Sequence, residues 1–113
     1  MTEIQNPKEL VDRLSRGNVI LMNEASWCGF CQQAKPEFIR QSEIHQDTDF
    51  LIFDMDKHRD KMTGHYSQLS DAVKSYPTIL AFKNTVEGVK AYKSSDGSRD
   101  DSTTANMVKF ISN

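Results

Sequence analysis

The chain carries two cysteines, Cys28 and Cys31, three positions apart and shortly after the run Val19–Asn23. That run is nearly all apolar and begins with β-branched residues, which is typical of a buried central strand. A helix from about Cys28 to His45 is predicted next, with apolar side chains recurring near one face. The cysteine pair is therefore expected at a strand-to-helix junction, where two thiols at this spacing can close a small reversible disulfide ring.

Cys28 would stand at the N-terminus of this predicted helix. Unpaired backbone N–H groups and the positive end of the helix dipole favour a thiolate there over a thiol. Because the thiolate is the reactive species in thiol–disulfide exchange, the pair indicates a redox enzyme. Alternatively, the two cysteines are half of a zinc site, which would need two more ligands. The candidate ligands are His45, His58 and His65, and none of them has the spacing of a zinc finger.

Length and composition indicate one globular domain spanning residues 1–113. The net charge of −2 comes without a long run of one sign, so neither nucleic acid nor an anionic membrane is an expected partner. No apolar run approaches the roughly 18 residues that cross a bilayer, and the first residues lack the pattern of a secretory signal. Both cysteines lie in one motif, unlike the several pairs of a small secreted domain. We therefore expect a cytoplasmic monomer.

Apolar periodicity and turn residues predict the other elements. Asn6–Glu9 has the pattern of a capped helix start, and Gly17 is placed to end that helix. The later strands and helices are expected at Phe50–Phe53, near Tyr66–Ser75, at Thr78–Phe82, at Val89–Tyr92 and at about Ser102–Ile111. Ile4 indicates a short extra edge strand. Asp54–Lys61 alternates acids and bases and is interpreted as a solvated loop.

This order predicts an α/β fold with a central mixed sheet of about four to five strands flanked by about four helices. Strands joined through helices pair in parallel by right-handed crossovers. The link Lys83–Gly88 is short enough for a hairpin, so the last two strands are expected to be antiparallel. Pro36 lies inside the helix after the cysteines and should kink it, since proline removes a backbone hydrogen bond.

The element order and four local features resemble the thioredoxin-like superfamily over nearly the whole chain. These features are Trp27–Cys31 at the strand-to-helix junction, Pro36 five residues past the second cysteine, Tyr76–Thr78 before a strand, and the closing hairpin and helix. The resemblance implies a thiol–disulfide oxidoreductase that reduces disulfides of client proteins and draws electrons from an upstream reductase. It implies no cofactor beyond the redox-active Cys28–Cys31 disulfide.

Within the superfamily the local details are mixed. Tyr76–Thr78 and Asp96–Arg99 look more like protein disulfide isomerase domains, and Arg99 is either a loop charge or lies near the active site as in those domains. Phe30 stands where thioredoxins usually have proline and isomerases usually have histidine. Because Phe30 adds no charge beside the thiolate, we expect a reduction potential below the about −180 mV of isomerases and nearer the about −270 mV of thioredoxin. A disulfide oxidase or isomerase and a redox-sensing binding module on the same fold are the alternative functions.

The resemblance also implies roles for individual residues. Cys28, partly exposed, is the attacking thiolate, and Cys31, more buried, resolves the mixed disulfide. Pro77 is predicted to follow a cis peptide beside the two sulfurs, which leaves the backbone of Tyr76 to pair with an extended substrate. Trp27 and Tyr76 are expected to frame an apolar docking patch. The predicted site is completed by Gly29 and Phe30.

One departure from the family concerns buried charge. Thioredoxins and isomerases place a buried acid six residues before the first cysteine, where this chain has Met22, and the lysine that often pairs with it corresponds to Ile52. Both charges are absent together. This is physically reasonable, because losing only one would leave the other buried without a partner, at a cost of several kcal/mol. Glu24, on the same strand face as Met22, is the nearest substitute as proton acceptor for the resolving thiol. Alternatively, Glu24 is a solvated residue at the strand end.

Overall fold

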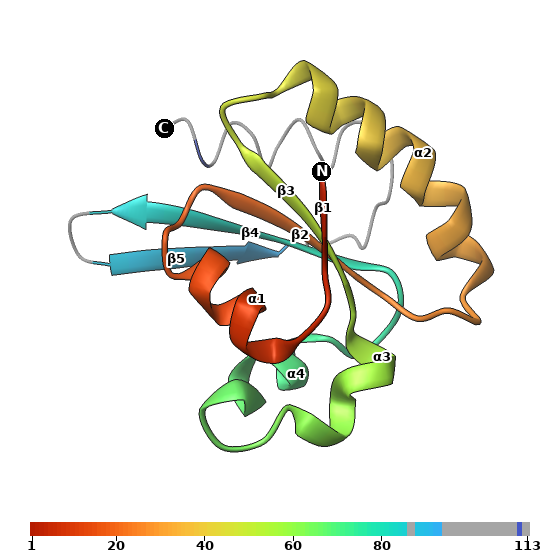
Figure 1. Ribbon diagram of the computed structural model, residues 1–113, viewed down its shortest axis with the longest axis vertical. Helices are drawn as coiled ribbons and strands as arrows, with labels where there is room; N and C mark the ends of the chain where they lie inside the picture. Colours follow the sequence, from red (N-terminus) through yellow and green to blue (C-terminus); the bar gives the residue numbers. More distant parts are fainter. Residues whose placement is uncertain (86–87, 94–110, 112–113) are drawn as a thin grey trace.

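The computed structural model describes residues 1–85, 88–93 and 111 (Figure 1). Its elements in chain order are β1 (Thr2–Ile4), α1 (Pro7–Leu14), β2 (Val19–Glu24), α2 (Gly29–Ile44), β3 (Asp49–Asp54), α3 (Met55–His58), the short 3-10 helices η1 (Arg59–Lys61) and η2 (Gly64–Tyr66), α4 (Ser67–Ala72), β4 (Thr78–Thr85) and β5 (Gly88–Lys93). The predicted alternation of helices and strands is confirmed over this part of the chain. Residues 96–99, including Arg99, and residues 102–110 of the last predicted helix lie outside it.

Among the described residues, five strands form one mixed sheet in the order β1-β3-β2-β4-β5 (Figure 1). β3 runs parallel to both β1 and β2, whereas β4 runs antiparallel to β2 and β5. These pairings confirm the predicted mixed sheet, the edge strand at Ile4 and the closing hairpin. β4 runs beyond its predicted end at Phe82 to Thr85, which pairs with Gly88. The two strands therefore take up most of the predicted link.

β2 lies at the centre of the sheet and is buried along its whole length. Its alternating side chains enter two apolar cores. Val19 and Leu21 belong to the core that includes α1, whereas Ile20 and Met22 belong to the core that includes α2. In Figure 1, α2 lies on the other side of the central strands from α1. Burial on both faces explains the continuous apolar sequence of this strand. Met22 pairs in register with Ile52, and both are core residues as predicted.

The first helix begins where its sequence predicts and ends at Leu14, a few residues before the predicted stop at Gly17. Asn6 caps it, and its side-chain oxygen accepts a hydrogen bond from the N–H of Glu9 at 2.8 Å. After the helix, Gly17 takes a φ of 73°, which glycine adopts at little cost. A Cβ at this position would clash with Asn84 of β4, whose backbone nitrogen would lie 2.7 Å away. Gly17 therefore serves both the turn after α1 and the close approach of that turn to β4.

The prediction of a solvated loop over residues 54–61 is wrong. The segment forms α3 and η1, and Asp54 caps α3 by accepting a hydrogen bond from the N–H of Lys57 at 2.9 Å. Met55 and His58 are buried, and the His58 ring stacks on Phe53 with 4.9 Å between ring centroids. Charged residues fill the exposed positions between these two, so the alternation of acids and bases conceals a short amphipathic helix.

The other helices differ from prediction mainly in length. α4 is shorter than the helix predicted near 66–75, and Val73 beyond its end is extended and buried. Pro36 lies inside α2 as predicted. Ile111 is helical and packs, partly buried, against the core that contains Phe38. None of the helices described is long and apolar enough to cross a membrane.

Candidate active site

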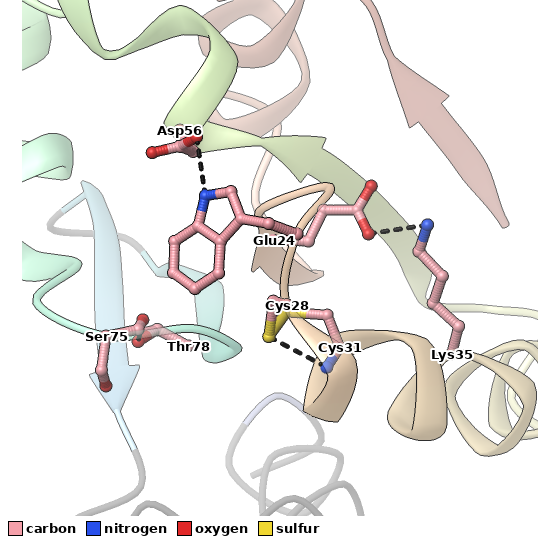
Figure 2. Close-up of a disulfide and its surroundings, with 8 residues drawn as sticks. Glu24, Cys28, Cys31, Lys35, Asp56, Ser75 and Thr78 are labelled. Atoms are coloured by element: carbon pink, nitrogen blue, oxygen red, sulfur yellow. Dashed lines mark hydrogen bonds and ion pairs between the residues drawn. A yellow bond between two sulfur atoms is a disulfide. The ribbon is translucent and has the colours of Figure 1, made fainter.

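The site forms where β2 passes into α2. The N–H of Cys28 donates to the carbonyl of Ala25 at 3.0 Å, which closes a tight turn after the strand. Cys28 is the N-cap residue of the 16-residue α2, and its Sγ accepts a hydrogen bond from the N–H of Cys31 at 3.1 Å (Figure 2). The sulfur thus takes the place of the oxygen with which serine or aspartate usually caps a helix. Gly29 follows at the first helical position, where a Cβ would meet no atom within 4 Å.

Cys28 and Cys31 are joined in a disulfide, with their Cα atoms 5.2 Å apart. Cys31 is fully buried, in agreement with the prediction. Cys28 is only 4% exposed, so the prediction that it is partly exposed is wrong for this oxidised state. The cause is packing, because Ala25 and Tyr76 cluster with the two cysteines.

The chain returns to the disulfide at the start of β4. The Tyr76–Pro77 peptide is cis, as predicted. The hydroxyl of Thr78 donates to the carbonyl of Ser75 at 2.6 Å. The Nδ2 of Asn23 donates to the carbonyl of Thr78 at 3.1 Å. The first bond closes the turn around Pro77, and the second anchors that turn to β2, the strand that leads into the cysteines.

Aromatic side chains surround the disulfide. Trp27 is 69% exposed, and its ring meets the Tyr76 ring edge to face, with 5.7 Å between centroids. The Nε1–H of Trp27 donates to Oδ2 of Asp56 at 3.0 Å (Figure 2). Phe30, in the first turn of α2, is also exposed. Trp27 and Tyr76 thus lie together as predicted, and exposed apolar groups of this kind are typical of interaction surfaces.

Asp56 is a residue of the site that the sequence interpretation missed. It comes two residues after β3 ends at Asp54, and Trp27 comes three residues after β2 ends at Glu24. β2 and β3 are parallel neighbours, so the segments that follow them begin at the same edge of the sheet. A prediction that used this strand order could therefore have placed Asp56 near Trp27.

Glu24 is buried and paired with a base. It is 8% exposed, and its Oε2 lies 2.7 Å from Nζ of Lys35 on α2. Figure 2 shows the carboxylate turned toward Lys35. The interpretation of Glu24 as a solvated strand-end residue is therefore wrong. Glu24 also lines a polar cavity of about 150 Å³, shared with Glu3, Asp54 and His58, which has room for several water molecules.

The histidines considered for a zinc site are used differently. The His45 ring stacks on Phe50 with 6.5 Å between centroids, and the His58 ring stacks on Phe53. The side chain of His65 lies outside the described part of the chain. Within residues 1–85, 88–93 and 111, no group of three or more histidine, cysteine, aspartate or glutamate side chains could hold a metal ion.

The sheet order and the position of the disulfide define a thiol–disulfide oxidoreductase domain. The family model described as Thioredoxin matches residues 2–111. The chain is 35% identical over 92 residues to the thioredoxin of Mycoplasma genitalium, a match that covers 80% of this chain and 84% of that protein. The chain therefore belongs to the thioredoxin family.

Further relatives agree with this assignment. Thioredoxin-1 of Saccharomyces cerevisiae is 28% identical over 91 residues, which cover 80% of this chain and 82% of that protein. The solved Trx4 domain of ERdj5 superposes with a TM-score of 0.77 at 18% identity, over 96% of this chain and 92% of that domain, and so shows the same fold. The match spans 15% of the full-length ERdj5 chain. Family membership together with the Cys28–Cys31 disulfide makes this chain a protein-disulfide reductase.

Proposed function

We propose that this chain reduces disulfides of client proteins with Cys28 as the attacking thiolate and Cys31 as the resolving thiol. The observation that carries the proposal is the hydrogen bond from the N–H of Cys31 to Sγ of Cys28 at the N-cap of α2. In the reduced protein, the same donor and the helix dipole would stabilise a thiolate on Cys28. Cys31, one turn into the helix and fully buried, is placed to attack that sulfur in turn.

The reaction consists of two thiol–disulfide exchanges. The Cys28 thiolate attacks one sulfur of the client disulfide, so a Cys28–client disulfide forms and the second client sulfur leaves as a thiolate. The Cys31 thiolate then attacks Sγ of Cys28, which closes the Cys28–Cys31 disulfide and releases the first client sulfur. Two electrons pass to the client, and its two thiolates take up the two protons that the cysteines gave up. The disulfide of the structure corresponds to the oxidised product.

Client docking is assigned to the surface around the disulfide. Trp27 and Phe30, both exposed, offer apolar contacts on either side of Cys28 in the sequence. Tyr76 packs next to the cysteines, and its backbone before Pro77 can pair with an extended segment of the client. The open space at Gly29 leaves room for the client backbone at the first turn of α2.

Glu24 is the proposed proton acceptor for Cys31. A carboxylate at this strand end is the nearest buried base to replace an acid at Met22. Its ion pair with Lys35 turns the carboxylate toward α2, the helix that carries Cys31, and we propose that a water relays the proton between the two groups. Glu24 also lines the polar cavity described above, through which water can reach its carboxylate.

The proposed cellular role is electron transport to client proteins and maintenance of redox balance in the cytoplasm. An upstream reductase would return the disulfide to the dithiol. The confinement of both cysteines to one motif supports a reducing compartment. We propose that residues 1–113 act as one monomeric domain without a cofactor, because the cysteine pair itself holds the two electrons that are transferred.

Reduction of insulin by dithiothreitol tests this function. The wild type is expected to speed the reaction, and Cys28→Ser is expected to abolish the effect. Reduced Cys31→Ser, freed of dithiothreitol and mixed with insulin, should accumulate a mixed disulfide on a non-reducing gel, because the second exchange is blocked. Equal activity of the wild type and Cys28→Ser would contradict the proposal and favour a binding module. Net formation of disulfides in a reduced client would favour the oxidase alternative.

A further inference from the structure

Arg59, at the start of η1, makes hydrogen bonds to three residues of the segment that leads to Pro77. Its Nη1–H donates to the carbonyl of Ser70 at 3.2 Å, and its Nη2–H donates to the carbonyl of Val73 at 3.0 Å. Nη2 also donates to the hydroxyl of Tyr76 at 2.7 Å. The guanidinium carbon lies 5.8 Å from the centroid of the Tyr76 ring. One side chain thus joins the end of α4 to the ring that packs on the disulfide.

These contacts depend on the geometry of arginine. α4 ends at Ala72, and the last carbonyls of a helix have no partner within the helix, so Arg59 supplies donors at this end. The planar guanidinium presents five N–H donors in a fixed arrangement, which the ammonium group of lysine does not reproduce. Arg59 thereby holds the segment 73–76 at its first residue, through a backbone carbonyl, and at its last residue, through a side-chain hydroxyl.

We propose that Arg59 is a positioning residue for client docking, because it holds the Tyr76 ring in place beside the disulfide. The inference rests on the proposed function, in which Tyr76 and Trp27 form part of the docking surface. The Tyr76 ring packs on the cysteine cluster and meets Trp27 edge to face. Asp56 accepts the hydrogen bond of Trp27, so residues 55–61 anchor both aromatic rings from one segment.

The expected effect of Arg59 is on client binding and not on the exchange chemistry. A surface already held in its binding geometry avoids the entropic cost of ordering side chains when the client arrives. Without Arg59, the Tyr76 side chain must be ordered at each binding event, which should raise KM for a protein client about three- to tenfold. A small disulfide does not need this surface, so its reaction with Cys28 should change by less than about twofold.

Arg59→Met and Arg59→Lys in the full chain test the inference. Reduced protein is mixed with insulin or with bis(hydroxyethyl) disulfide, the reaction is quenched with acid and alkylated, and the thiols left on this chain alone are counted from its mass. Both variants should raise the half-saturating insulin concentration about three- to tenfold, while the limiting rate and the rate with the small disulfide stay near those of the wild type. Lys74→Met removes the same charge from an exposed position before Pro77 and should behave as the wild type.

Tyr76→Phe tests the same contact from the other side, and it serves if Arg59→Met does not fold. It keeps the ring and removes the hydroxyl that Nη2 binds. Because the two groups act through one contact, Tyr76→Phe and Arg59→Met together should raise KM by less than the product of their separate effects.

Three results separate the possible failures. Wild-type insulin kinetics in Arg59→Lys would mean that only the charge matters, and would overturn the positioning role. Equal losses with insulin and with the small disulfide, together with a lower urea midpoint, would overturn it in favour of general destabilisation. A wild type with no more activity than Cys28→Ser would overturn the proposed function, and the docking inference with it.

Discussion

Lys35 Nζ lies 2.7 Å from Oε2 of Glu24, and this ion pair joins α2 to the end of β2 (Figure 2). The side chains of Lys35 and Glu24 are 22% and 11% exposed. Met22, two residues earlier on β2, is apolar and packs in the core with Ile52. The opposite charges therefore lie at the rim of the core and not within it, which spares them the full cost of desolvation.

Lys35→Met should destabilise the fold, because it leaves a largely buried carboxylate without its counter-charge. We expect the free energy of unfolding to fall by about 1–3 kcal/mol, less than for a fully buried pair, since both side chains keep some contact with water. Urea unfolding measures this change. The double variant Glu24→Gln/Lys35→Met should recover most of the loss, whereas Lys8→Met, at an exposed position of α1, should cost less than about 0.5 kcal/mol. An unchanged urea midpoint in Lys35→Met would show that the pair adds nothing to stability.

Glu24→Gln should slow the release of the client from Cys28 at neutral pH. Glutamine cannot accept the proton of Cys31, and we expect the second exchange to slow about a hundredfold, the low end for a general base, because the proposed water relay is less direct than a hydrogen bond. Quenched-flow measurement of the mixed disulfide with insulin follows this step. Glu43→Gln, at an exposed position of α2, makes the same charge change and is the control. If the mixed disulfide decays at the same rate in both variants, Glu24 has a structural role only.

Gly17→Ala should be the most damaging of three glycine replacements. Its φ of 73° strains any side chain, and its Cβ would clash with Asn84, so we expect a loss of about 2 kcal/mol or more. Gly64→Ala has a similar φ of 61° but open space around it, and should cost about 1 kcal/mol. Gly29→Ala has open space and no positive φ, and should stay within about 0.5 kcal/mol of the wild type. Thermal unfolding of the three variants in any other order would contradict this account.

Phe30→His should make the disulfide more oxidising. A positive charge in the first turn of α2 stabilises the Cys28 thiolate and therefore the reduced form, which raises the reduction potential by about 10–20 mV. Equilibration against glutathione buffers measures the potential, and Phe30→Leu is the uncharged control. For the wild type we expect a value nearer about −270 mV than about −180 mV. A wild-type potential at or above the second figure would refute the role assigned to Phe30.

The features predicted correctly are those that are specified by residues close to one another in the sequence. The run 19–23 and the residues after it have the periodicities of a buried strand and a helix, so β2 and α2 follow from short stretches of sequence. Asn6 marks the start of α1, and Gly17 marks the turn after it, through backbone chemistry that needs little help from distant residues. The cysteine pair predicts its own disulfide, because the first turn of a helix brings side chains three residues apart onto one face.

The prediction fails where a side chain's surroundings come from a distant part of the chain. Cys28 is buried because Tyr76, far along the sequence, packs against it. His58 is a separate case, because its ring stacks on Phe53 only five residues earlier, a contact that the charged residues around it in the sequence conceal. The motif Tyr76–Thr78 predicted that this segment lies near the two sulfurs, but not that Cys28 is buried there.

The amino-acid sequence by itself determined the order of the elements, the disulfide and the place of its first sulfur at a helix N-terminus, since neighbours along the chain are enough to specify them. Only the tertiary structure decided what surrounds that sulfur. It placed Tyr76 against the cysteines and Arg59 on Tyr76, and it paired Lys35 with Glu24 at the strand end. These contacts join different elements, and they exist only once the packing of helices on the sheet has brought those elements together.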